Sequence, residues 1–139
     1  MAEQARSGAV RPRPLSPHLQ IYRWPVTMAT SITHRATGLA LAAGTLLVAW
    51  WLIALASGPA QYDLFSTIAR GLVGQLVLFG FVWSLAFHLL NGIRHLAWDV
   101  GYGFDVHAAN RSGVLAVTFS LFVAIGVFAF AYFAKGMHL

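Results

Sequence analysis

Three long stretches of the chain are apolar and carry no Asp, Glu, Lys or Arg. They cover residues 36–56, 71–93 and 112–134. A helix rises about 1.5 Å per residue and needs roughly 20 residues to cross about 30 Å of hydrocarbon, and each stretch is long enough to do so. The pattern therefore predicts three membrane-spanning helices, over about 26–57, 65–98 and 110–135, after an N-terminal arm of residues 1–25.

Composition agrees with this pattern and indicates the fold class. Of 139 residues, 58% are hydrophobic and 9% are charged, which leaves too few polar side chains to cover a soluble protein. We expect an all-α membrane protein with a single membrane-anchor domain over 1–139, so any site should lie within or beside the bilayer. The absence of cysteine excludes disulfides, Cys-ligated zinc, thiolate haem ligands and iron–sulfur clusters held by this chain itself.

The placement of arginine predicts the orientation. Five arginines precede or open the first span, at positions 6, 11, 13, 23 and 35, whereas the next loop offers only Arg70 beside Asp63. Because Lys and Arg concentrate on the cytoplasmic side, the N-terminus is expected in the cytoplasm. The formal net charge of +5 is then mainly a topology signal, and nucleic-acid binding is disfavoured because these arginines are few and flank apolar spans.

The N-terminal arm is rich in proline, at positions 12, 14, 17 and 25. Proline at this density prevents a helix and favours an extended conformation along the membrane interface. Two uses fit such an arm: a surface anchor, or a contact strip for a soluble partner docked on the cytoplasmic face.

Polar side chains gather where the second span ends. His88, Gly92, His95 and Asp99 follow i, i+4, i+7 and i+11, which is one continuous helix face. At about 1.5 Å per residue, His95 lies about 5 Å and His88 about 15 Å from the cytoplasmic end. A purely structural role for Asp99 is pairing of its carboxylate with His95 or Arg94 at the water boundary.

The first span carries a matching polar group near its start. Ser31 shares a helix face with His34 and Arg35, and all three fall in the cytoplasmic half. The two motifs are therefore predicted to converge at one membrane level, with His34 closer in depth to His95 than to His88.

A deep histidine beside a glycine indicates a binding site. Ionisable groups inside a membrane are costly and usually functional, and Gly92 leaves room for a flat group or another backbone. A neutral His88 suits an axial ligand of a b-type haem. His95 is about 10 Å away on the same face and cannot bind the same iron, so the second ligand is expected on another chain. His34, Arg35 and His95 are placed to meet haem propionates or other anions, although His95 could also simply be hydrated.

Three motifs carry a specific resemblance: RPLSPHLQIY over 13–22, SITHRATG over 31–38 and HLLNGIRHLAWD over 88–99. Together and in this order they resemble the cytochrome b556 subunits of succinate dehydrogenase, the larger membrane anchors of respiratory complex II. The resemblance implies that His88 is a haem b ligand, with the other ligand on a smaller hydrophobic partner. It implies a quinone site at Ser31 and Arg35, and propionate contacts from His34, Arg35 and His95.

The function implied by the resemblance is that of an anchor in succinate:quinone oxidoreductase, in which electrons from succinate reduce ubiquinone. The flavoprotein and iron–sulfur partner subunits would carry the succinate chemistry, and the chain would lie among lipids of a bacterial inner membrane rather than a mitochondrial one. The alternatives are a haem-free structural anchor, a fumarate reductase anchor, or a proton-relay subunit. A relay is disfavoured because the third span has no ionisable group before Tyr132. Ser31 and Arg35 also have a purely structural alternative. The Ser31 hydroxyl could cap its helix or bond to a carbonyl of the preceding turn, and Arg35 could extend to the lipid headgroups.

Overall fold

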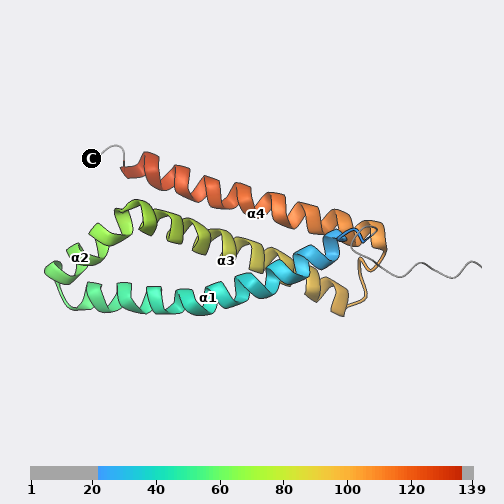
Figure 1. The fold of residues 1–139 in the computed structure, drawn as a ribbon, viewed down its shortest axis with the longest axis horizontal. Helices are drawn as coiled ribbons and strands as arrows, with labels where there is room; N and C mark the ends of the chain where they lie inside the picture. Colours follow the sequence, from blue (N-terminus) through green and yellow to red (C-terminus); the bar gives the residue numbers. More distant parts are fainter. Residues whose placement is uncertain (1–21, 136–139) are drawn as a thin grey trace, which may run out of the picture.

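The computed structural model describes residues 22–135, and these form four helices. The helices are α1 (Val26–Ala56), α2 (Pro59–Arg70), α3 (Leu72–Asp99) and α4 (Val106–Lys135). Three of them, α1, α3 and α4, are long and apolar enough to cross a membrane. They run alternately up and down in a flat bundle, with α2 as a short crosspiece at one end (Figure 1). The all-α membrane fold predicted from the sequence is confirmed.

The second span begins later than predicted. Residues 65–70 belong to α2, and the chain bends at Gly71, whose backbone is extended at ψ 157°. At this corner the Ile68 carbonyl occupies the space where a side chain on Gly74 would stand. The side-chain amide nitrogen of Gln75 donates to the Ala69 carbonyl at 2.8 Å. The glycines allow the tight bend that divides the predicted helix in two.

The other helix starts depend on local caps. Helix α1 begins at Val26, where the Pro25 carbonyl accepts from the amides of Met28 and Ala29. The third span begins at Val106 rather than about 110 because the Asp105 carboxylate accepts the amides of His107 and Ala108, at 3.0 and 3.1 Å. Of the proline arm, residues 1–21 lie outside the described part, and residues 22–25 are exposed and not helical.

The bundle packs through small side chains. Buried positions on α4 include Ala116, Ser120 and Ala124. A side chain added at Gly113 would stand 3.1 Å from Val26 and 3.5 Å from Arg94, so α4 lies close to both α1 and α3. Small residues let membrane helices approach closely where no hydrophobic effect drives them together.

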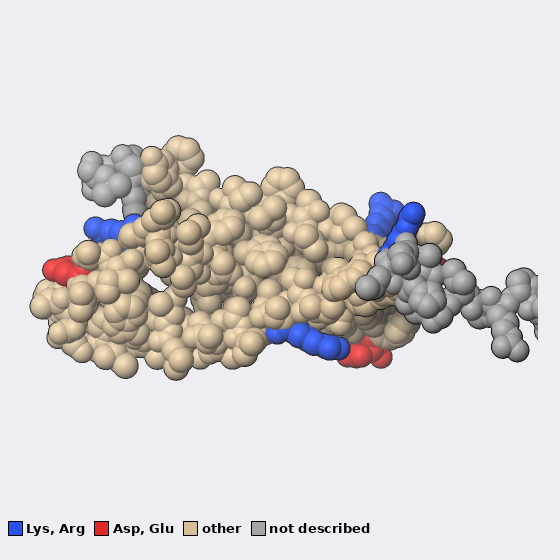
Figure 2. Space-filling model, viewed as in Figure 1, with Lys and Arg blue, Asp and Glu red and all other residues tan. Residues whose placement is uncertain are grey.

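The outside of the bundle is apolar, and the charges lie toward its ends. Leu39 and Phe130 are 75% and 77% exposed, which suits lipid or a partner helix rather than water. On the face shown in Figure 2, charged side chains appear at the far left and in the right-hand part, and the broad region between them has none. The start of α1, the end of α3 and the start of α4 meet at the right-hand end (Figure 1).

Candidate functional site

Three histidines from two helices form a cluster near that end. The His34 ring of α1 stacks on the His88 ring of α3, with centroids 3.8 Å apart and planes at 12°. The His95 ring lies 5.2 Å from His34 at a tilt of 55°. The predicted convergence of the two motifs is therefore present in the fold.

The His34 ring lies nearer to the His88 ring than to the His95 ring, whereas the sequence had suggested that His34 is closer in depth to His95. Counting at about 1.5 Å per residue puts His34 about 12 Å into α1, between the levels of the other two. The packing of α1 against α3 then determines which of the rings meet. A side chain on Gly38 would stand 3.1 Å from Cε1 of His88, so the bare glycine lets the His88 ring come up against α1.

The hydrogen bonds of His88 leave one ring nitrogen available. Its Nδ1 lies 3.1 Å from the His34 carbonyl oxygen and 3.3 Å from Oγ1 of Thr37. The Thr37 hydroxyl donates its own proton to that carbonyl at 3.0 Å, so both neighbours act as acceptors. The proton of a neutral His88 therefore belongs on Nδ1, and the lone pair on Nε2 can bind a metal. Metal-binding histidines are commonly oriented through a bond of this kind.

Open space lies beside this histidine. Within the described part of the chain, no neighbouring atom comes within 4 Å of the position that a side chain on Gly92 would occupy. The sequence left two readings for Gly92, a flat group or another backbone. No backbone among residues 22–135 fills the space, so a flat group has room there.

His34 contributes an unsatisfied polar atom to the cluster. Its Nδ1 is buried and has no hydrogen-bond partner among residues 22–135. Buried polar atoms are nearly always paired, so this one indicates a missing partner. The residues from 22 to 135 contain no group of three side chains able to chelate a bare metal ion. One available histidine, a gap and an unpaired nitrogen fit a haem, which His88 would hold.

Arg94 holds the three long helices together beside this cluster, a role that was not predicted from the sequence. Only 7% of its surface is exposed. The guanidinium donates to oxygens on all three helices: Oγ1 of Thr30 at 3.3 Å, Oδ1 of Asn91 at 3.0 Å, the Ala109 carbonyl at 2.7 Å and Oγ of Ser112 at 2.9 Å. It also lies 4.1 Å from the centre of the Trp98 ring.

The expected pairing of Asp99 is absent. Arg94 turns into the bundle, and Asp99 is exposed, with no ion pair among residues 22–135. The sequence signal for the role of Arg94 was its position inside an apolar helix, three residues after Asn91. Its partners on α1 and α4 are 64 and 15 to 18 residues away, so no local pattern could identify them.

Ser31 and Arg35, the predicted quinone residues, remain accessible. Ser31 is half-buried and Arg35 is exposed. The hydroxyls of Thr30, Thr33 and Thr37 all bond to carbonyls of their own helix. Ser31 forms no such bond within the described chain, so the back-bonding alternative is not adopted. Its hydroxyl is available to a ligand.

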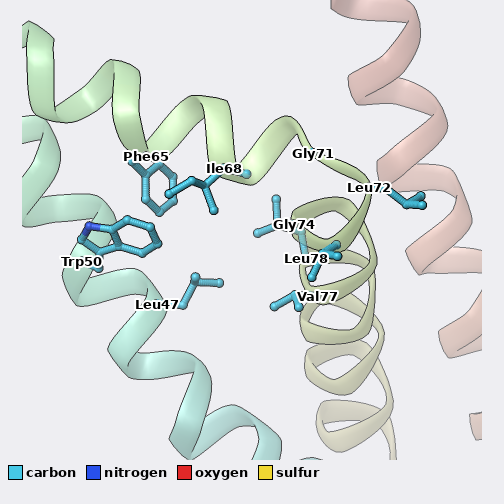
Figure 3. Close-up of a pocket in the computed structure, with 11 residues that line it drawn as sticks. Leu47, Trp50, Phe65, Ile68, Gly71, Leu72, Gly74, Val77 and Leu78 are labelled. Carbon is cyan, nitrogen blue, oxygen red and sulfur yellow. The ribbon is translucent and has the colours of Figure 1, made fainter.

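A separate cavity lies away from the histidines and is lined by apolar side chains. It lies at the opposite end, where α2 meets α1 and α3, and has a volume of about 340 Å³ (Figure 3). The side chains around it, which include Leu47, Trp50, Phe65 and Val77, contain no ionisable group. The candidate site is therefore the histidine cluster.

Several known proteins are similar to this chain. A family model described as succinate dehydrogenase/fumarate reductase transmembrane subunit matches residues 9–128. A cytochrome b556 subunit of succinate dehydrogenase from Paracoccus denitrificans is 42% identical over 81% of this chain and 87% of the relative. The Rickettsia typhi counterpart is 40% identical over 81% and 88%. A mitochondrial cytochrome b560 subunit from Sus scrofa is 38% identical over 84% and 70%.

Proposed function

The chain belongs to the succinate dehydrogenase/fumarate reductase transmembrane subunit family, and from that premise we propose that it anchors a succinate dehydrogenase. In this role it holds haem b together with a partner subunit and forms part of the site where ubiquinone is reduced. With three apolar helices and bacterial relatives, it is a multi-pass protein of the bacterial inner membrane.

The geometry of His88 carries the haem proposal. The carbonyl of His34 and the hydroxyl of Thr37 hold its Nδ1 and leave Nε2 as the metal-binding atom. When bound there, the haem supplies one-electron chemistry. His34, Arg35 and His95 surround the same end and would meet its propionates, and the unpartnered Nδ1 of His34 supports a ligand at this position.

Ser31 and Arg35 would serve the quinone. A serine hydroxyl donates a hydrogen bond to a carbonyl oxygen, and a guanidinium stabilises the negative charge that develops on that oxygen during reduction. The Ser31 hydroxyl has no partner within the described chain, which supports this role. Arg35 is exposed and can reach a ligand at the boundary of the bundle.

The partners follow from the chemistry that this chain lacks. It has no cysteine and therefore holds no iron–sulfur cluster, and we propose that its second haem ligand comes from another chain. We therefore assign it an iron–sulfur subunit, a flavoprotein subunit and a second small hydrophobic anchor. The arginines before the first span support a cytoplasmic side for the soluble partners, which would then lie beside the histidine cluster.

The haem proposal is tested with a dithionite-reduced minus oxidised spectrum of membranes that contain the assembled complex. We expect a b-type band in the wild type and its loss in His88→Ala. His107→Ala, an exposed histidine at the start of α4, is the matched control and should keep the band. A wild type without a band indicates a haem-free anchor, and a band that survives His88→Ala would mean that both axial ligands lie on other residues.

The quinone proposal is tested with Ser31→Ala. We expect the KM for ubiquinone to rise about tenfold, because a hydrogen bond worth about 1 to 1.5 kcal/mol is lost. Succinate oxidation by a soluble artificial acceptor should not change. Thr45→Ala, whose hydroxyl bonds only to the Ala42 carbonyl, is the control. An unchanged KM in Ser31→Ala would remove this serine from the quinone site.

A further inference from the structure

Asn91 connects the buried arginine to one of the three histidines. Its side chain is fully buried on α3. Oδ1 accepts from Nη1 of Arg94 at 3.0 Å, and Nδ2 lies 3.2 Å from Nε2 of His95.

The chemistry of arginine fixes which way the Asn91 amide faces. A guanidinium has only donors, so the atom that meets it must be the amide oxygen. The amide nitrogen, which only donates, therefore faces His95. A donor at 3.2 Å requires an acceptor opposite it, so Nε2 of His95 carries no proton. A protonated imidazolium would put two donors face to face in a buried position.

We propose that Asn91, held by Arg94, fixes His95 as a neutral imidazole with its proton on Nδ1. Asn91 and Arg94 are then positioning residues. They occupy the Nε2 lone pair of His95 and leave Nδ1 as a hydrogen-bond donor for an anionic or carbonyl group. This tautomer is the minority form of a free histidine in water, so the protein must impose it.

The two histidines on this face of α3 thereby acquire opposite chemistry. His88 keeps a lone pair on Nε2 for a metal, whereas the Nε2 of His95 is occupied and its Nδ1 is protonated. This explains why the shallower histidine does not compete for the iron. The choice of iron as the partner of His88 rests on the proposed function, but the tautomer of His95 does not depend on it.

The test is solid-state NMR of the complete complex in lipid, with histidine uniformly labelled with ¹³C and ¹⁵N. Protonated and unprotonated ring nitrogens resonate in separate regions, and one-bond correlations to Cγ or Cδ2 tell Nδ1 from Nε2. The signals lost in His95→Gln identify this residue. In the wild type we expect His95 to have a protonated Nδ1 and an unprotonated Nε2. The reduced haem spectrum, recorded on the same samples, reports separately on the proposed function.

Two variants of Asn91 test its role directly. Asn91→Asp keeps the shape and the bond from Arg94 but replaces the amide donor with an acceptor, so the Nε2 of His95 should become protonated. Asn91→Leu removes the constraint, and the Nε2-protonated form should appear. Gln75→Glu adds a carboxylate at the far end of α3 and should leave His95 unchanged. An Nε2-protonated His95 in the wild type, or an unchanged His95 signal in both Asn91 variants, overturns the inference, and the wild-type result stands even where a variant fails to assemble.

Discussion

At the scale of single residues, the hydroxyl of Thr37 is a small group with a testable effect on His88. It accepts from Nδ1 at 3.3 Å and is almost fully buried, with 2% of its surface exposed. Removing a group that orients a metal-binding histidine typically costs 10- to 100-fold in metal affinity. Because the His34 carbonyl remains as a second acceptor, we expect Thr37→Val to lower haem retention by about tenfold.

The measurement for Thr37→Val is the ratio of haem to protein in the complex during washing with a competing haem-binding protein. Thr45→Val is the control, since Thr45 makes the same kind of back-bond on α1 far from the cluster. Equal retention in the two variants would show that Thr37 does not hold His88.

The residues of the site were only partly predictable from the sequence. The spacing of His88 and His95 along α3 is a property of one helix, and His34 falls in the matching half of α1, so their convergence was accessible. The stack of His34 on His88 was not, because it depends on how α1 crosses α3 at Gly38. The proposed roles of Ser31, Arg35 and His95 remain predictions.

At the scale of the helices, Arg94 holds one end of the bundle together. Arg94→Leu leaves buried acceptors on α1, α3 and α4 without their donor, and each unsatisfied group costs about 1 to 3 kcal/mol. We expect a loss of about 3 kcal/mol in total, because Thr30 and Ser112 keep bonds to carbonyls of their own helices.

The measurement is the temperature at which the detergent-solubilised complex dissociates. This temperature should fall clearly in Arg94→Leu and less in Arg94→Lys, since an ammonium keeps the charge but cannot reach all four acceptors. Arg111→Leu removes an exposed arginine near the start of α4 and should have no effect. Identical dissociation temperatures for Arg94→Leu and Arg111→Leu would contradict the conclusion that Arg94 holds the three long helices together.

The helices themselves were largely predictable, and the corners were less so. Length and apolar composition are enough to recognise a span, and they identified all three. The break at Gly71 was missed because residues 65–70 continue a helical pattern into the next stretch. Only the packing of α2 against Gly74 requires the chain to bend there.

At the scale of the whole molecule, the proposed orientation makes the α1–α2 loop external and the α3–α4 loop cytoplasmic. The chain lacks cysteine, so a single introduced cysteine is the one thiol of this chain that can be labelled. In right-side-out membranes, Ser57→Cys should react with a membrane-impermeant maleimide. Tyr102→Cys should react only after permeabilisation and removal of docked subunits. The opposite labelling pattern would reverse the topology, and with it the face on which we put the soluble partners.

The one-sided arrangement of the ionisable groups has an electrical consequence. From Leu72 to Phe87, α3 has no ionisable side chain over about 24 Å of its length, so this helix offers charge no route to the far surface. Under the proposed function, electrons and protons both reach the quinone from the cytoplasmic side. Carrying a unit charge across 100 mV costs about 2.3 kcal/mol, and this reaction avoids that cost. Turnover should therefore proceed at the same rate whether or not the membrane is energised, and it should store no voltage of its own.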